Sequence, residues 1–193
     1  GMTVLQIPGG LSSLGNNMFS GCTNLTKIVF LYGLTGVPSY MCSGMSSLTE
    51  VVFEEGPQGE ASTMQSIGAN AFYNCTGLEH ISLPAGITSI GNSAFYGCTS
   101  LETAELPYEL TDIGKYAFYN CMAIKNINIP SGVTRLGDYI FYNCTSLEKV
   151  RMAGEVTRIG ASAFYGCSVL KSVELPPSVT AIGSSAFYNC SLL

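Results

Sequence analysis

The chain has 193 residues, of which 47% are hydrophobic and 11% are charged, so its length allows one substantial core or one extended array of repeats. The hydrophobic fraction is ordinary for a folded protein, which excludes a disordered chain. Eight basic against thirteen acidic side chains give a net charge of −5, which excludes a nucleic-acid-binding protein that needs a basic excess.

Targeting and membrane signals are absent from the sequence. No run approaches the roughly 18 apolar residues of a membrane span, so membrane insertion is not expected. The N-terminus lacks a basic segment followed by an apolar one, so no signal peptide is predicted. Because Gly1 and Met2 lead directly into a structured pattern, we interpret the chain as an excised piece of a longer protein.

A repeat of 23 residues runs through the chain. The phrase Ala-Phe-Tyr-x-Cys, with Ile140 in place of its alanine in one copy, recurs with its phenylalanine at Phe72, Phe95, Phe118, Phe141, Phe164 and Phe187. An earlier copy has Phe19, and a degenerate one has Cys42 at the Phe position and Met45 at the Cys position. Seven extra residues, Glu54 to Glu60, form a turn-rich acidic insertion. The sequence therefore predicts a single domain over residues 1–193, with eight coils and an insertion near 54–60.

Each copy begins with a short strand. In Leu78 to Leu83, the alternation of Ile81 and Leu83 is typical of a strand, and Pro84 ends it. The same alternation returns at Val51/Phe53, Ala104/Leu106, Ile127/Ile129, Val150/Met152 and Val173/Leu175. Since the strands recur in one direction and are joined by a full turn of chain, they predict a solenoid with a parallel β-sheet on one face.

A glycine-marked turn and a helical segment follow the strand. After the apolar pair Ile87 and Ile90, the glycine position is occupied by Gly15, Gly68, Gly91, Gly114, Gly137, Gly160 and Gly183, with Pro38 in the degenerate copy. Apolar residues then fall at offsets 0, 4, 5, 8 and 11 from Ile90, which predicts a short helical or 3-10 turn on the other face, with Asn92 as its cap.

The residue before each cysteine position is always glycine or asparagine. These residues are Gly21, Gly44, Asn74, Gly97, Asn120, Asn143, Gly166 and Asn189. Glycine and asparagine tolerate positive φ best, so we expect the backbone to adopt the left-handed conformation at these eight positions.

The motif Leu-x-x-Ile-x-Leu-Pro, followed by Ile-Thr-x-Ile-Gly-x-x-Ala-Phe-x-x-Cys-x-x-Leu, spans Leu78 to Leu101. It resembles the leucine-rich repeats of the BspA-like class, over essentially the whole chain, and only the second and third copies depart from it. This resemblance implies a leucine-rich-repeat solenoid from a bacterial protein that is secreted or on the cell surface. It also implies adhesion to host matrix proteins or other cells, and no catalysis.

Seven of the eight cysteines share one repeat position, and the eighth is Cys42. Stacked coils would bring neighbouring cysteines within reach of a disulfide. In stacked repeats, however, every cysteine has the same surroundings, whereas disulfides would have to join them in pairs. Met45 also replaces the cysteine of one copy, and no neighbouring copy shows a compensating loss of its own cysteine. We therefore expect buried thiols that act as small hydrophobic groups. There is no Cys-x-x-Cys motif, so no metal site is predicted.

The sequence contains no recognisable catalytic motif. The only histidine, His80, lies on a predicted strand beside Glu79 and has no partner nucleophile. Threonines recur with the repeat at Thr88, Thr111, Thr134, Thr157 and Thr180, which indicates a hydroxyl ladder on a turn. No paired carboxylates, phosphate loop or nucleophile elbow occurs. We expect neither an enzyme nor a cofactor.

The outward side of the strands varies from copy to copy, as a recognition surface does. Residues 1–123 carry nine acidic and two basic side chains, whereas residues 124–193 carry four acidic and six basic ones. Lys125, Lys149 and Arg151 therefore form a candidate site for an anionic partner. The alternative is a solvated face of mixed charge.

A row of tyrosines is the second candidate surface. It comprises Tyr73, Tyr96, Tyr119, Tyr142, Tyr165 and Tyr188, and Tyr116 and Tyr139 lie three residues before Tyr119 and Tyr142. Exposed tyrosines would suit recognition of a protein or a sugar. The alternative is a stacked ladder in which only the hydroxyl groups reach water. Among these residues Tyr116, Tyr119, Tyr139 and Tyr142 are the candidate ligand-binding residues.

The interpretation that best accounts for these features is a non-enzymatic binding scaffold. Its partner would be a protein or glycan on a host or neighbouring cell, with no nucleic acid and no membrane insertion. The alternative is a structural spacer without its own ligand. The first copy lacks a polar cap and the chain stops at Leu193, which has two interpretations: a longer protein was trimmed, which is the favoured one, or the open ends associate end to end with another chain.

Overall fold

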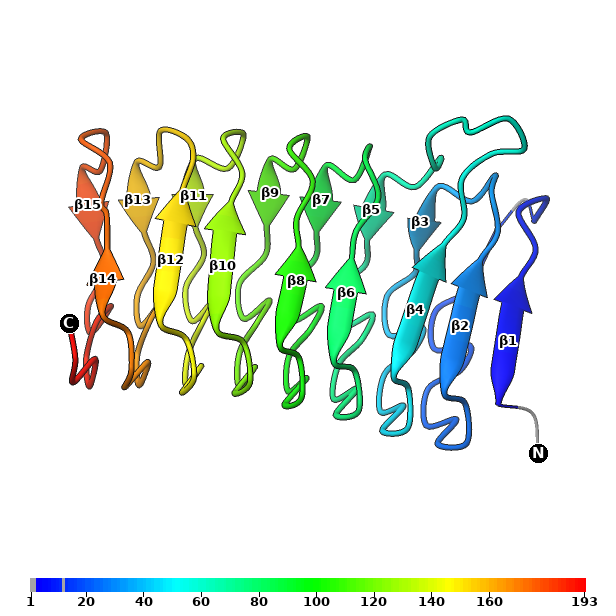
Figure 1. Ribbon diagram of the computed structural model, residues 1–193, viewed down its shortest axis with the longest axis horizontal. Coiled ribbons are helices and arrows are strands. Elements are labelled where there is room, and N and C mark those ends of the chain that lie inside the picture. The colour runs from blue at the N-terminus through cyan, green and yellow to red at the C-terminus, as the bar shows by residue number, and fades with distance from the viewer. Residues whose placement is uncertain (1–2, 12) are drawn as a thin grey trace.

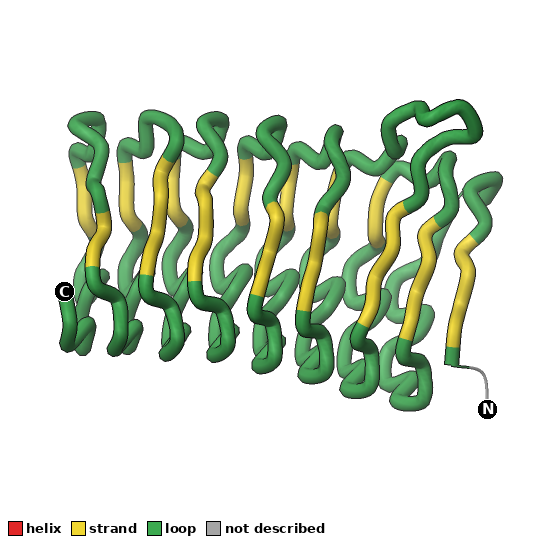
Figure 2. The backbone as a smooth tube through the Cα atoms, viewed as in Figure 1, coloured by secondary structure: helices red, strands yellow, loops and turns green. Residues whose placement is uncertain are grey.

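The computed structural model describes residues 3–11 and 13–193, and it forms a solenoid of stacked coils (Figure 1). Gly1 and Met2, on which the interpretation of an excised piece depends, lie outside the described residues. After the first coil, whose described residues contain only a front strand, each coil runs up through a strand on one side and down through a second, shorter strand on the other (Figure 1 and Figure 2). We call these the front row and the back row.

The front row contains eight strands in the described part of the chain. They are β1 (Val4–Ile7), β2 (Lys27–Phe30), β4 (Glu50–Phe53), β6 (His80–Ser82), β8 (Thr103–Glu105), β10 (Asn126–Ile129), β12 (Lys149–Met152) and β14 (Ser172–Val173). Their hydrogen-bonded orders are β1-β2-β4, β6-β8 and β10-β12-β14, and every pairing is parallel. The register advances by 23 residues from strand to strand, as in Asn126 opposite Lys149. The predicted parallel sheet is confirmed.

The back row consists of two-residue strands. They are β3 (Gly36–Val37), β5 (Ser66–Ile67), β7 (Ser89–Ile90), β9 (Asp112–Ile113), β11 (Arg135–Leu136), β13 (Arg158–Ile159) and β15 (Ala181–Ile182). They pair in parallel in the orders β3-β5-β7-β9 and β11-β13-β15. The sequence did not reveal this second sheet, because two residues are too few to show an alternation of period two.

The predicted helical turns are wrong, since no helix occurs in residues 3–11 and 13–193. In the coil after β7, Ser93 and Gly97 have φ of 55° and 71°, and a right-handed helix cannot pass through these values. The amides of Ser93, Phe95 and Gly97 donate to the next coil, and those between them close tight turns within their own coil. These turns bring an apolar side chain inward every three to four residues, which imitates the helical period.

The left-handed backbone predicted before each cysteine position is confirmed at all eight sites, where φ lies between 55° and 74°. A second left-handed residue precedes each by four positions, at Asn17, Tyr40, Asn70, Ser93, Tyr116, Tyr139, Ser162 and Ser185. The predicted cap residue Asn92 caps no helix; its Oδ1 accepts the amide of Lys115 in the next coil at 2.9 Å.

The repeated glycine is required by close packing between coils. A Cβ at Gly114 would lie 2.4 Å from the amide nitrogen of Asn92, and one at Gly91 would lie 2.5 Å from that of Ala69. These contacts are with backbone, which cannot move aside without opening the stack. The predicted turn does begin here, since the amide of Ala94 donates to the carbonyl of Gly91.

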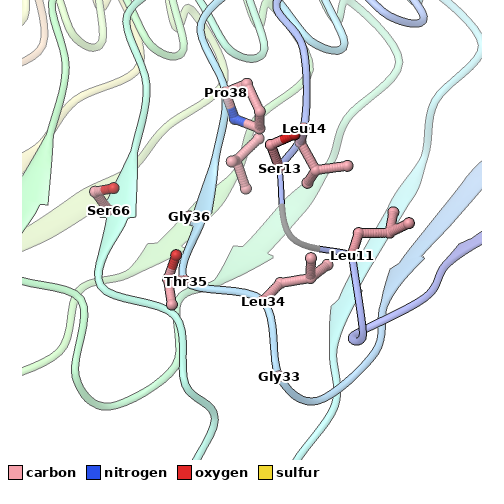
Figure 3. A pocket seen from close by; sticks show the side chains of 10 residues that line it. Leu11, Ser13, Leu14, Gly33, Leu34, Thr35, Gly36, Pro38 and Ser66 are labelled. Carbon is pink, nitrogen blue, oxygen red and sulfur yellow. The ribbon is translucent and has the colours of Figure 1, made fainter.

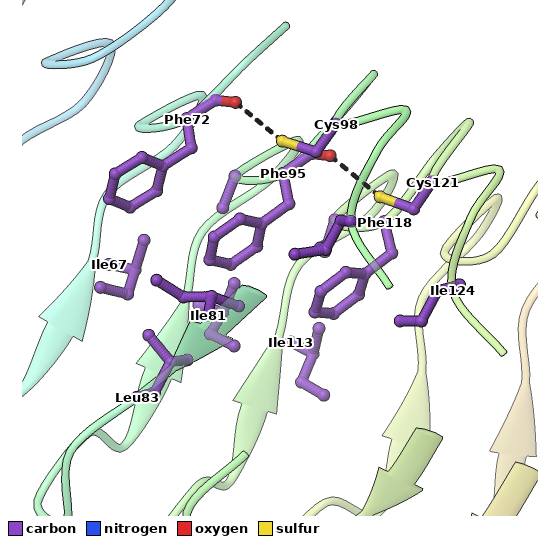
Figure 4. Packing of buried hydrophobic residues seen from close by; sticks show 14 of the residues in the cluster. Ile67, Phe72, Ile81, Leu83, Phe95, Cys98, Ile113, Phe118, Cys121 and Ile124 are labelled. Carbon is purple, nitrogen blue, oxygen red and sulfur yellow. Dashed lines mark hydrogen bonds between the residues drawn. The ribbon is translucent and has the colours of Figure 1, made fainter. Parts of the chain in front are cut away.

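The core lies between the two rows and repeats with the coils (Figure 4). Phe72, Phe95 and Phe118 are fully buried, and each ring centroid lies 5.3 Å from the next. Inward residues of both rows, such as Ile81 and Ile67, close around these rings. Stacked aromatic pairs add about 0.5–1.5 kcal/mol beyond the area that they bury.

The cysteines form a second inward column, and all eight are free. The thiol of Cys98 donates to the carbonyl of Phe72 at 3.2 Å, and that of Cys121 donates to the carbonyl of Phe95 in the same way (Figure 4). Six thiols are buried, as predicted, at Cys42, Cys75, Cys98, Cys121, Cys144 and Cys167. Cys22 is exposed and Cys190 is half-buried, because both lie near an end of the stack.

Candidate binding surfaces

The outward side chains of the early front strands pair with one another across the rungs. The Nζ of Lys27 lies 2.7 Å from the Oε1 of Glu50. One rung pair further along, the Oγ of Ser82 donates to the Oε2 of Glu105 at 2.7 Å. His80 also lies here, with Nδ1 2.8 Å from the hydroxyl of Thr103. This part of the face satisfies its own polar groups.

The outward side chains of β10 and β12 are arranged differently. Asn126 stands opposite Lys149, and Asn128 opposite Arg151. Within the described ranges, no ion pair or hydrogen bond joins these four side chains to any other. We call these four residues the open quartet.

Two depressions lie over the open quartet. One of 220 Å³ is lined by its four residues alone. The other, of 480 Å³, is lined by Asn128, Lys149 and Arg151 together with Met152, Ala153 and Glu174. Lys149 and Arg151, which the sequence singled out, are thus brought together at one place with two amide side chains.

Lys125, the third predicted basic residue, is placed apart from these depressions. Its Nζ lies 3.1 Å from the Oε2 of Glu102, one coil earlier. The corresponding position one coil later is Glu148, which pairs with Lys171 at 2.7 Å. Lys125 therefore belongs to a row of charges that pair from rung to rung just before the front strands.

The tyrosine row is a stacked ladder. The ring centroids of Tyr96 and Tyr119 lie 4.5 Å apart, and those of Tyr119 and Tyr142 lie 4.7 Å apart. All but the last member are half-buried, and Tyr188 is 54% exposed. Burial is the main cause that raises the pKa of Tyr96 and Tyr119. Because each ring face is covered by the next ring, the interior members present only their edges and hydroxyl groups.

Tyr116 and Tyr139 form a second, shorter stack, with centroids 4.8 Å apart, tilted against Tyr119 and Tyr142. Both residues have left-handed backbone, with φ of 59° and 58°. Bulky side chains adopt this conformation at a cost that asparagine largely avoids, and asparagine or serine holds the position in several other coils. The four candidate tyrosines are thus adjacent; whether they bind a ligand stays a prediction.

The buried thiols are not suited to nucleophilic chemistry. Burial raises the pKa of Cys75 and Cys167 to about 12 and that of Cys98 and Cys121 well above its usual range. A thiol attacks only as its thiolate, so these groups are inert at neutral pH. The threonine ladder is structural as well, since the hydroxyls of Thr111 and Thr157 donate to backbone carbonyls of the preceding coil.

A further depression, of 460 Å³, lies at the N-terminal side of the back row (Figure 3). Leu11, Leu14 and Leu34 lie along it with Thr35 and Ser66. None of its lining residues is titratable, so the lining offers no acid or base to activate its hydroxyl groups. Throughout residues 3–11 and 13–193 no cluster of three His, Cys, Asp or Glu side chains is placed to hold a metal ion. Over those residues, no helix meets the length and apolarity that crossing a bilayer demands.

Both ends of the stack expose apolar side chains. Val4 and Met18 are 46% and 45% exposed at one end, and Ile182 and Leu193 are 50% and 56% exposed at the other. End-to-end self-association stays a prediction.

The stacked coils, with one parallel strand each on the front and a Phe and Cys column inside, define a leucine-rich-repeat solenoid. More specifically, the chain belongs to the BspA-type leucine-rich repeat family, whose model matches residues 1–58 and 65–193 in six copies. The unmatched residues lie in the long connection between β4 and β5, where the acidic insertion was predicted.

Solved structures of bacterial proteins share this fold. A leucine-rich repeat protein of T. pallidum is 24% identical, with a TM-score of 0.75, over 87% of this chain and 78% of that one. A leucine-rich cell surface protein of Faecalibacterium prausnitzii A2-165 is 28% identical, with a TM-score of 0.71. That match covers 100% of this chain and 46% of the other, so this chain spans less than half of that protein's length. The comparison with curated proteins finds no relative.

Sequence reasoning missed one pair of charged residues. Arg135 on β11 and Arg158 on β13 are both exposed and stand opposite each other on the back row. The signal was present, since the two arginines are one repeat apart. It was overlooked because the back row was not recognised as a sheet, so its outward position was not considered.

Proposed function

We propose that this chain is a non-catalytic recognition scaffold of a bacterial surface or secreted protein, and that it binds an anionic surface on a partner protein through the open quartet. The family supplies a protein-binding repeat scaffold. A cell-surface protein with this fold, which the chain matches over its full length, supports the location.

One observation carries the proposal. Asn126, Asn128, Lys149 and Arg151 have no side-chain partner among the described residues, whereas most polar groups on the earlier rungs pair with each other. On a strand, alternate residues are about 6.6 Å apart, and neighbouring strands are about 4.8 Å apart. The quartet is therefore a small rectangle of two cations and two amides. Such a surface can bind carboxylates and backbone carbonyls of a partner.

The test is a binding screen of the purified chain against immobilised matrix proteins and glycans, at low and moderate salt. K149E/R151E should abolish binding of a protein partner or weaken it by at least about tenfold, and should reduce its salt dependence. R135E/R158E makes the same change in net charge on the back row and serves as the matched control. Equal loss in both variants would show that only net charge matters and would remove the quartet from consideration.

The second candidate function is a structural spacer, which the self-satisfied rungs between β2 and β8 favour. A folded sample that binds no member of the panel would support it. Adhesion to a host would then have to depend on other parts of a longer protein.

A further inference from the structure

The basic side chains of the later coils are not confined to the front row. Arg135 and Arg158 are the outward residues of β11 and β13, and their Cα atoms are partners in the parallel register. Their inward neighbours Leu136 and Ile159 are buried, so the guanidinium groups extend to the opposite side of the solenoid from the open quartet. Neighbouring strands place two such side chains about 4.8 Å apart at their origins.

The carboxylate of Asp138, which lies near Arg158, is already engaged. The Oδ2 of Asp138 lies 2.8 Å from the Nζ of Lys115, and its Oδ1 accepts the amide of Ala161 at 3.0 Å. These two contacts, the one with Lys115 first, lower the pKa of Asp138, and Arg158 contributes only the weakest attraction. Lys115, Arg135 and Arg158 together thus exceed the two nearby carboxylates, Asp138 and Asp112, by one positive charge.

Neither arginine has another partner in the described part of the chain. Asp112 stands one coil before Arg135 in the same column, yet no ion pair joins them. Like charges directly opposite on neighbouring strands destabilise a sheet. The fold does not require arginine here, because the same column holds Gly36, Ser66, Ser89 and Ala181 in other coils. The fold therefore gives no structural reason for two arginines at this position.

The guanidinium groups of Arg135 and Arg158 are suited to bind a tetrahedral oxyanion. Each guanidinium presents a planar fork of N–H donors that matches two oxygens of one anionic group. A carboxylate has two oxygens and satisfies one fork, whereas a sulfate ester has three free oxygens and can share them between two forks. The outward residues of the later back strands, Asp112, Arg135, Arg158 and Ala181, are all exposed, so an elongated chain can lie along this part of the column.

We infer that Arg135 and Arg158 form a second binding site, for the sulfate groups of a sulfated polysaccharide. The site is independent of the open quartet, because it lies on the other row and uses different residues. It gives the solenoid two recognition faces in the same coils, one for a protein and one for a sulfated glycan.

The experiment measures binding to dextran sulfate, with uncharged dextran and polyglutamate of similar length as comparisons. The variants are R135S/R158S and K149S/R151S, which remove the same charge. Serine already occurs in each column concerned, at Ser89 on the back row and at Ser172 and Ser82 on the front row, so both variants should fold. Circular dichroism melting checks this.

R135S/R158S should weaken dextran sulfate binding by about tenfold or more and should lower the salt dependence by roughly two counterions. K149S/R151S should change it by less than about threefold, and dextran should not bind. Equal losses in the two variants would overturn the inference, as would polyglutamate binding as tightly as dextran sulfate. Neither result bears on the protein partner of the open quartet, which the K149E/R151E screen tests separately.

Discussion

The inward columns of the solenoid and the open quartet follow opposite rules. Inside, the coils place similar residues at the same position, so that Phe118 stacks on Phe95 one coil away and the thiol of Cys121 donates to the carbonyl of Phe95. In the open quartet, Lys149 and Arg151 contact no counterpart in the described residues, although β10 and β12 are in perfect register. Repetition therefore accounts for stability, and we propose that the outward residues that do not pair bind the partner.

The largest loss of stability is expected from removing a side chain of the buried phenylalanine column. Phe118 is fully buried and stacks on Phe95 and Phe141 at 5.3 and 5.6 Å. Phe118→Ala should lower the free energy of unfolding by about 3–5 kcal/mol, because it opens a cavity on both sides. Chemical denaturation measures this. Tyr119→Ala, one residue later on the half-buried ladder, should cost clearly less; an equal cost would mean that the two columns do not differ.

Adding a single methyl group between coils should also destabilise the stack. At Gly114 a new Cβ would meet the backbone of Asn92 and Gly91 at 2.4–2.6 Å. Gly114→Ala should therefore cost about 1–3 kcal/mol by overpacking. Gly10→Ala is the matched control, since nothing lies within 4 Å of a Cβ there. Similar melting temperatures for the two variants would contradict close packing as the reason for the glycine column.

Because its thiols are buried, the protein should have a lower free energy of unfolding in alkali. Burial raises the pKa of Cys75 from an ordinary 9.0 to about 12, so the folded state holds its proton more tightly than the unfolded state. The resulting stabilisation is complete below pH 9 and is lost as the pH rises from 9 towards 12.

Cys75→Ala should reduce the slope of unfolding free energy against pH in this range by up to about 1.4 kcal/mol per pH unit. Denaturation between pH 8 and pH 11 measures the slope. A slope identical to that of the parent protein would show that this thiol is not buried in solution.

The smallest effect on stability is expected at the open quartet. Lys149 and Arg151 contribute no internal pair within the described residues, so K149S/R151S should leave the melting temperature essentially unchanged. Lys27→Ser breaks the ion pair with Glu50 and should lower it slightly. A clear drop for K149S/R151S would show that the quartet has a structural role, which would sharpen the case for the spacer.

Most of the fold follows from the sequence, because a 23-residue repeat leaves few ways to stack. The front strands and the left-handed residues before each cysteine were predictable from residue type. The sequence predicted helical turns because the tight turns around the left-handed residues Ser93 and Gly97 return apolar side chains at nearly the helical spacing. The reason for the glycine column is not visible in the sequence, since the contacts between coils join residues 22 or more positions apart.

The candidate surfaces were only partly predictable. Charge sorting along the chain identified Lys149 and Arg151, but the same count included Lys125, which pairs with Glu102. Whether side chains on neighbouring strands pair depends on the strand register and on their rotamers, and neither can be read from the distribution of charge along the sequence. Arg135 and Arg158 required the back row, whose strands are too short to show in the pattern.

The most direct test of the central claim is lysine labelling of the chain, free and in complex with a protein partner from the screen. The five lysines, Lys27, Lys115, Lys125, Lys149 and Lys171, mark different places on the surface. Mass spectrometry after brief acetylation should show that the partner protects Lys149 strongly while Lys27 and Lys115 react as in the free chain. Protection of Lys27 or Lys115 with Lys149 unchanged would contradict the assignment of the open quartet as the recognition site.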